Sequence, residues 1–213
     1  MNRYFTELVG TFFLTLTIAL TGNPMAIGCT LIALIYMGYN SSGAHYNPAV
    51  TLAIYILKLT SGKEAILYVL AQIIGAALAS VFFHLLYGNT RIFFLFPDHS
   101  INILKPLAME AVLTFALVSV VLYTAANPKN SGNQFYGLAI GLVVIGLGYM
   151  GQFSGGAYNP AVGFVPIVFE TFFGACSCNP ITHSWIYITG PLLGGAAAAL
   201  WFRISSLSEK RPS

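Results

Sequence analysis

The sequence predicts an all-α membrane protein with six transmembrane helices and two re-entrant half-helices, arranged as an inverted three-plus-three repeat. Of the 213 residues, 57% are hydrophobic and only 7% are charged, whereas an average soluble domain is about 25% charged. Apolar stretches of membrane-spanning length recur along the chain. A nonapeptide that contains Asn-Pro-Ala occurs twice, as SGAHYNPAV from Ser42 and as SGGAYNPAV from Ser154.

Six apolar stretches approach the roughly 20 residues that cross a bilayer core. They cover residues 4–20, 25–39, 65–87, 107–126, 135–150 and 185–204. The first is expected to stay in the mature protein, because Glu7 interrupts it and another apolar stretch follows almost at once. The second and fifth are short and contain glycines, so their ends are the least defined.

The orientation follows from basic residues near the ends of the spans, because cytoplasmic loops carry an excess of Lys and Arg. With six spans, seven basic residues fall on one side: Arg3, Lys58, Lys63, Lys129, Arg203, Lys210 and Arg211. Only Arg91 and Lys105 fall on the other side. Both termini are therefore expected in the cytoplasm, with a short C-terminal tail. This bias also explains the net charge of +3, so no nucleic-acid partner is expected.

The two halves of the chain correspond along their whole length. Three landmarks recur in the same order, namely Glu7, the nonapeptide from Ser42 and QIIGAALA from Gln72, then Glu110, the nonapeptide from Ser154 and PLLGGAAA from Pro191. The chain is expected to form a single domain over 1–213, built from repeats at 1–88 and 106–204 that an extracellular loop joins. Because each repeat has three spans, the second repeat starts on the opposite side and is inverted in the membrane.

The nonapeptides are expected to enter the membrane from opposite faces without crossing it. Unpaired backbone groups exposed to lipid cost several kcal/mol each, so these loops must line a polar cavity. Asn47 and Asn159 are favoured helix caps, and a proline follows each at the first helical position. The apolar residues beyond predict two half-helices of about 10 residues that meet end to end. Each presents a positive dipole end of about +0.5 charge at the midplane.

This junction predicts a site for neutral solutes. Asn47 and Asn159 can each direct an amide N–H at a solute that carries a lone pair, whereas a cation would meet two positive helix ends. An ion- or proton-coupled transporter would need a charged group near this point, and only Glu7 and Glu110 are candidates. No nucleophile-base pair, phosphate loop or cofactor motif points to an enzyme or to a bound cofactor.

The motifs SGAHYNPAVT, SGGAYNPAV, the repeated Glu-x-x-x-Thr-Phe and WIYITGPLLGG resemble the aquaporin, or major intrinsic protein, family over essentially the whole chain. The resemblance implies the aquaporin fold, one pore in each subunit and a homotetramer embedded in membrane lipid. It implies pore motifs at Asn47, Pro48, Ala49, Asn159, Pro160 and Ala161. By the same resemblance Glu7 and Glu110 brace the re-entrant loops, with a proton relay as the alternative, and His45 lines the pore or senses pH.

The resemblance also implies an outer constriction at four positions counted from the asparagines. They are Ile27, Leu147, Gly156 and Val162. A shift of one or two residues in the glycine-rich GLGYMGQ would bring Gly148 or Tyr149 to the place of Leu147. Water-selective members usually carry an aromatic residue, a histidine, a small residue and an arginine at these places. This chain lacks the arginine and has an apolar filter, and NPAVGFVP resembles the tonoplast intrinsic protein branch.

These residues predict a passive channel for water and small neutral solutes such as ammonia, hydrogen peroxide, urea or glycerol. The alternative is a poorly conducting structural or adhesive member of the same fold, in which Tyr36, Tyr46 or Tyr158 would block the passage. A metal site in CSCNPITH, from Cys176, Cys178 and His183, is not favoured, because metal loops usually offer more ligands at better spacing.

Overall fold

The computed structural model describes residues 2–93, 95–97, 102–130, 132–174 and 180–208. Over these residues the chain forms helices, with short helical turns between them and no strand. Four residues considered above for the metal site and the orientation lie outside the described residues: Cys176, Cys178, Lys210 and Arg211. The long elements are α1 (Arg3–Thr21), α2 (Pro24–Ser42), α3 (Pro48–Ile56), α4 (Gly62–Tyr87), α5 (Leu104–Val121), α6 (Tyr136–Met150), α7 (Pro160–Phe173) and α8 (Ile186–Ser208).

Five segments of the described chain are long and apolar enough to cross a membrane. They are Arg3–Thr21, Pro24–Ser42, Gly62–Tyr87, Leu104–Ala126 and Ile181–Ser206. The sixth expected span is α6, which has 15 residues and a length of about 22 Å. Its backbone packs directly on α2, because a Cβ atom at Gly28 would lie only 2.6 Å from the carbonyl oxygen of Gly141. Small residues allow such close helix packing in membranes.

The two repeats pack their outer helices in the same way. A Cβ atom at Gly75 of α4 would lie 2.3 Å from the carbonyl oxygen of Leu8 in α1. A Cβ atom at Gly194 of α8 would lie 2.2 Å from the carbonyl oxygen of Ala111 in α5. The glycines of QIIGAALA and PLLGGAAA therefore serve equivalent helix pairs, which is the packing that an inverted repeat produces.

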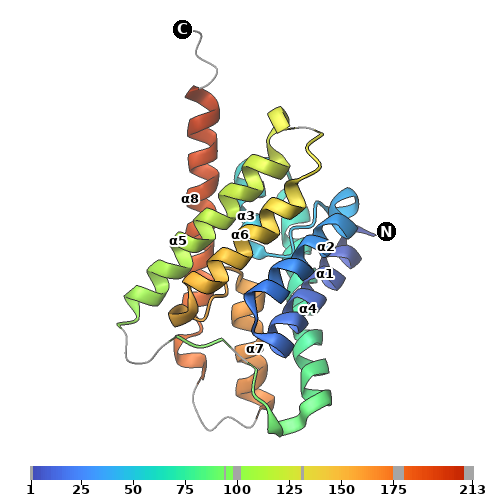
Figure 1. Ribbon diagram of the computed structural model, residues 1–213, viewed down its shortest axis with the longest axis vertical. Helices are drawn as coiled ribbons and strands as arrows, with labels where there is room; N and C mark the ends of the chain where they lie inside the picture. The colour runs from blue at the N-terminus through green and yellow to red at the C-terminus, as the bar shows by residue number, and fades with distance from the viewer. Residues whose placement is uncertain (1, 94, 98–101, 131, 175–179, 209–213) are drawn as a thin grey trace.

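The two short helices start at the asparagines, as the sequence predicts. The Asn47 side chain accepts a hydrogen bond from the Ala49 amide at 2.8 Å, and the Asn159 side chain accepts one from the Ala161 amide at 3.1 Å. Figure 1 shows α3 extending toward the end of the molecule that carries the C-terminus and α7 toward the opposite end. Helix α3 has 9 residues, close to the expected length.

Helix α7 is longer than the half-helix that the sequence predicts. It has 14 residues and Gly174 is its C-cap, because no glycine or proline stands between residues 167 and 173 to end it earlier. Pro166 lies inside this helix without ending it. Proline removes one backbone hydrogen bond but can be accommodated in a packed membrane helix.

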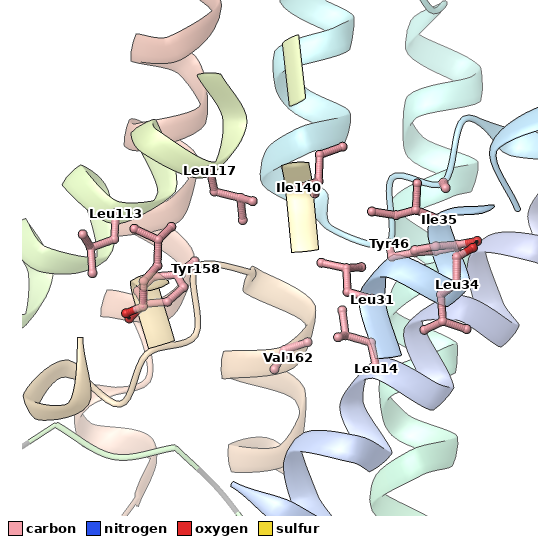
Figure 2. Packing of buried hydrophobic residues seen from close by; sticks show 12 residues of the cluster. Leu14, Leu31, Leu34, Ile35, Tyr46, Leu113, Leu117, Ile140, Tyr158 and Val162 are labelled. Atoms are coloured by element: carbon pink, nitrogen blue, oxygen red, sulfur yellow. Dashed lines mark hydrogen bonds between the residues drawn. The ribbon is translucent and has the colours of Figure 1, made fainter. Parts of the chain in front are cut away.

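An apolar cluster fills the space around the two loops that precede α3 and α7. Its buried members come from α1, α2, α5, α6, α7 and both loops, and ten of them are labelled in Figure 2. Leu14 and Leu31 represent the first repeat in this cluster, and Leu113 and Leu117 the second. The loops are therefore surrounded by protein rather than by lipid, as their backbone requires.

Candidate functional site

Asn47 and Asn159 meet across the interface between the two repeats. The Asn47 Nδ2 donates to the carbonyl oxygen of Tyr158 at 2.8 Å, and the Asn159 Nδ2 donates to the carbonyl oxygen of Tyr46 at 2.8 Å. Each amide oxygen already caps its own helix. Since one of the two N–H groups of each amide donates to the opposite loop, each side chain has one N–H left. Both side chains are buried and border the same cavity. The arrangement offers two fixed donors at one place.

Glu7 holds the backbone of the first loop from α1. Its carboxylate accepts hydrogen bonds from the His45 amide at 2.9 Å and from the Tyr46 amide at 2.7 Å. It also accepts from Ser42 Oγ at 2.6 Å and from Gln72 Nε2 at 2.8 Å. The side chain is fully buried, and these four donors compensate its removal from water.

Glu110 makes the equivalent contacts from α5. It accepts from the Ala157 amide at 3.1 Å, from the Tyr158 amide at 2.7 Å and from Ser154 Oγ at 2.8 Å. The first repeat has one additional donor, because Gln72 corresponds to Pro191, which has none. The described contacts of each carboxylate are with donors in its own repeat, so they form no chain of acids between the two.

Tyr46 and Tyr158 hold the turn before each asparagine in a strained conformation. Their φ angles are 49° and 47°, a left-handed region that costs a non-glycine residue of order 1–3 kcal/mol. The Tyr46 hydroxyl donates to the carbonyl oxygen of Leu34, and the Tyr158 hydroxyl to that of Leu147, both at 2.9 Å. Each phenol is therefore held in the helix packing, away from the asparagines that it precedes.

The third tyrosine considered as a block is also engaged elsewhere. The Tyr36 hydroxyl donates to the carbonyl oxygen of Gln134 at 2.8 Å, and its side chain is 43% exposed on the outside of the bundle. Tyr36 does not line the cavity, whereas Tyr46 and Tyr158 do.

The cavity has a volume of about 330 Å³. Of the four expected filter positions, Ile27, Gly156 and Val162 line it. Leu147 does not: it is 5% exposed and packs in the apolar cluster, while the neighbouring Gly148 lines the cavity. The shift by one residue is the alternative that the glycine-rich segment left open.

Four helices each contribute a row of residues to the cavity wall, and most of these residues are aliphatic. The rows are Leu14 and Ile18 in α1, Ile27, Leu31, Ile35 and Tyr39 in α2, Leu117, Val121 and Ala125 in α5 and its continuation, and Ile140, Val144 and Gly148 in α6. Within each row the spacing is four residues, which places the side chains on one helix face. Sequence reasoning missed Tyr39 and these rows, although the four-residue spacing was a signal for them.

His45 belongs to the cavity wall on the side of the first loop. Its Nδ1 lies 3.1 Å from Thr51 Oγ1, and its ring packs edge-on against Tyr68 with 5.1 Å between centroids. The Tyr68 hydroxyl donates to the carbonyl oxygen of Ser42 at 2.9 Å, and the equivalent Tyr187 donates to that of Ser154 at 2.7 Å. His45 is thereby held by the contacts that shape the loop.

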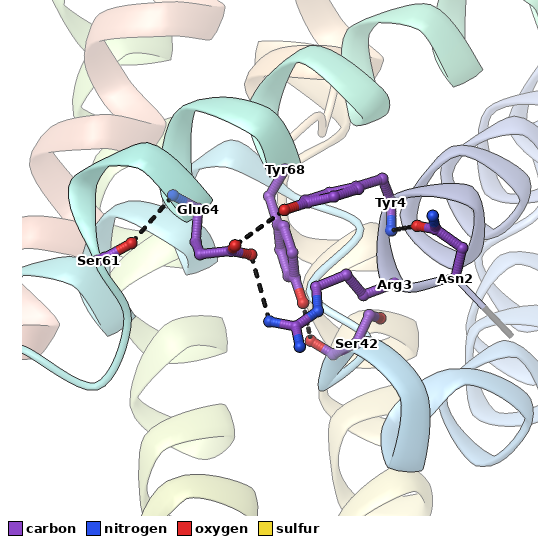
Figure 3. A network of polar contacts seen from close by, with 7 residues as sticks. All are labelled: Asn2, Arg3, Tyr4, Ser42, Ser61, Glu64 and Tyr68. Carbon is purple, nitrogen blue, oxygen red and sulfur yellow. Dashed lines mark hydrogen bonds and ion pairs between the residues drawn. The ribbon is translucent and has the colours of Figure 1, made fainter.

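A polar network next to this loop joins the starts of α1 and α4 (Figure 3). The Tyr4 hydroxyl donates to Glu64 at 2.8 Å, and Arg3 lies 3.3 Å from the same carboxylate. Ser61 caps α4 by accepting from the Glu64 amide at 3.2 Å. The network is partly exposed, so it positions the helix ends rather than the cavity itself.

Comparison with known proteins agrees with this geometry. The family described as Major intrinsic protein matches residues 15–202. Probable aquaporin TIP4-1 of Oryza sativa subsp. japonica is 36% identical over 188 residues, covering 85% of this chain and 70% of that protein. Probable aquaporin AqpM of Archaeoglobus fulgidus is 34% identical over 181 residues, covering 82% of this chain and 72% of that protein.

A solved structure extends the comparison to the fold. The aquaglyceroporin from Plasmodium falciparum superposes with a TM-score of 0.77, covering 98% of both chains, at 21% sequence identity. That likeness shows the aquaporin fold, including its six spans, two re-entrant helices and inverted repeats. With the family match over most of its length, the chain belongs to the major intrinsic protein family and is a multi-pass integral membrane protein.

Proposed function

We propose that this protein is a passive channel for water and small neutral solutes. The observation that carries the proposal is a cavity that passes both Asn47 and Asn159 and has a largely aliphatic wall. Each asparagine supplies an N–H that can donate a hydrogen bond to the lone pair of a hydroxyl, carbonyl or amine. The pore is formed within one chain, and four chains assemble in the membrane with both termini in the cytoplasm.

The outer filter consists of Ile27, Gly148, Gly156 and Val162, and it selects weakly by hydrogen bonding. None of these side chains has a donor or acceptor, and the two glycines add no side-chain volume. Water therefore loses hydrogen-bond partners at this level, while a larger and less strongly hydrated solute meets no arginine. Ammonia, hydrogen peroxide, urea and glycerol are the solutes that we propose for this wall.

Solute flux through purified protein in vesicles tests the proposal. Stopped-flow light scattering of proteoliposomes is expected to show water permeability above that of empty vesicles, and uptake of glycerol and urea above the same baseline. Vesicles that carry the protein but match empty ones for every solute would contradict the channel and favour a non-conducting structural role. Protein content is matched by quantitative immunoblotting of the vesicles.

Exclusion of cations is expected to depend on the two helix ends that meet at Asn47 and Asn159. Asn159→Asp places a negative charge beside the positive ends of α3 and α7, so it lowers the barrier to cations. We expect a potassium leak in vesicles that the unmodified protein does not show, measured with a membrane-potential dye. Asn102→Asp is the matched control, because Asn102 is exposed and does not line the cavity. A potassium leak of equal size in both variants would contradict this assignment.

A further inference from the structure

A second pocket lies outside the channel, at the end of the bundle where α3 and α8 end and α5 passes into a π-helical turn (Leu122–Ala126). Its volume is about 530 Å³, within the range of small-molecule sites. Its wall combines apolar side chains, such as Leu57 and Phe202, with hydroxyl and basic groups. We propose that this pocket binds the phosphate headgroup of an anionic membrane lipid.

Three basic residues from three separate segments border the pocket. Lys58 follows α3, Lys129 lies in the turn after α5, and Arg203 lies in the last part of α8. All three side chains are exposed, and neither Lys58 nor Arg203 forms an ion pair with a described residue. Segments far apart in the sequence thus place positive charge around one concave surface, which favours an anion.

Hydroxyl groups in the same wall are engaged in hydrogen bonds of their own, which fix the shape of the pocket beside the basic groups. Ser206 Oγ donates to the carbonyl oxygen of Arg203 at 3.1 Å, and Tyr123 Oη is hydrogen-bonded to Ser205 Oγ. Tyr123 comes from the π-helical turn, a rare geometry that is frequent at functional sites. The turn brings Tyr123 into the pocket wall beside Ser205 and Ser206 of α8.

The position of the pocket selects a lipid over a soluble anion. In the orientation proposed above, on which this inference rests, this end of the bundle lies at the cytoplasmic surface, where anionic headgroups are found. The apolar part of the wall, which includes Ile56, Leu57 and Leu59, suits the acyl chains below a headgroup. Basic residues at helix C-termini also stabilise the helices themselves, but that role requires no pocket between them.

Lipid binding to the purified protein, followed by native mass spectrometry, tests the inference. Dioleoyl phosphatidylglycerol and dioleoyl phosphatidylcholine share their acyl chains and differ in headgroup charge. We expect the double variant Lys58→Gln, Arg203→Gln to bind phosphatidylglycerol about 25-fold more weakly than the unmodified protein, at roughly fivefold for each lost charge. Binding of phosphatidylcholine is expected to stay the same.

Lys63→Gln is the matched control, because Lys63 is exposed on the same side of the membrane and lies outside the pocket. It should change phosphatidylglycerol binding by less than about twofold. An equal loss in the control, or no loss in the double variant, overturns the site. Inorganic phosphate is added as a competitor at the concentration of the lipid, and complete displacement would overturn the lipid assignment in favour of a soluble anion.

A second measurement, the salt dependence of lipid binding, uses the unmodified protein, so its outcome does not depend on whether a variant folds. Raising the salt from 0.1 to 1 M shortens the screening length from about 10 to 3 Å. The preference for phosphatidylglycerol over phosphatidylcholine should therefore fall at least tenfold. A preference that does not change with salt overturns the electrostatic site. Water permeability of the double variant is expected to equal that of the unmodified protein, because the pocket lies outside the channel.

Discussion

Val162→Arg is expected to lower glycerol and urea permeability at least tenfold, while water permeability falls less than threefold. Val162 lies three residues after Asn159, is 1% exposed and lines the cavity opposite aliphatic side chains from α1 and α2. A guanidinium group there narrows the passage and supplies five N–H donors. Water can exchange hydrogen bonds with those donors, whereas a larger solute is excluded by size.

The size and the charge of the new side chain must be separated. Val162→Met is the control, because methionine lengthens the side chain without adding a donor. We expect Val162→Met to reduce the flux of water and glycerol together, and only the arginine to discriminate between them. Both are measured by stopped-flow swelling at equal protein content. Unchanged glycerol flux in a folded Val162→Arg protein would refute the assignment of Val162 to the filter.

Glu7→Ala is expected to prevent stable folding or to lower the thermal unfolding midpoint by more than 10 °C. The substitution leaves the amides of His45 and Tyr46 without their acceptor. It also removes the acceptor of Ser42 Oγ and one of the two acceptors of Gln72 Nε2. Each unpaired buried donor costs about 1–3 kcal/mol. Leaving the two backbone amides unpaired therefore removes by itself a large part of a typical unfolding free energy of 5–15 kcal/mol.

Glu64→Ala is the matched control for this loss. Glu64 is also a carboxylate on a membrane helix and also accepts from a tyrosine, but its side chain is 28% exposed. Exposed ion pairs contribute about 0–1 kcal/mol, so the unfolding midpoint should move by only a few degrees. Fluorescence-detected size exclusion after heating measures both variants. A Glu7→Ala protein as stable as Glu64→Ala would show that the loop holds its shape without the carboxylate.

Local features of the sequence determined much of the fold. The apolar stretches defined the spans because the bilayer requires a set length of apolar helix. Asn-Pro defined the starts of α3 and α7 because both residues act within one helical turn. The recurrence of Glu7 as Glu110 and of one nonapeptide as the other indicated the inverted repeat, since symmetry can be read from order alone.

Other properties depend on contacts between distant segments, and only the tertiary structure decided them. The rotation of α6 brought Gly148 rather than Leu147 to the cavity. Counting residues through a glycine-rich segment does not show which of two neighbouring residues faces the cavity. The cross-bonding of Asn47 to Tyr158 joins loops that lie far apart in sequence. Lys58 and Arg203 likewise border one pocket only because α3 packs against α8. Sequence order specifies local geometry, whereas packing decides which faces meet.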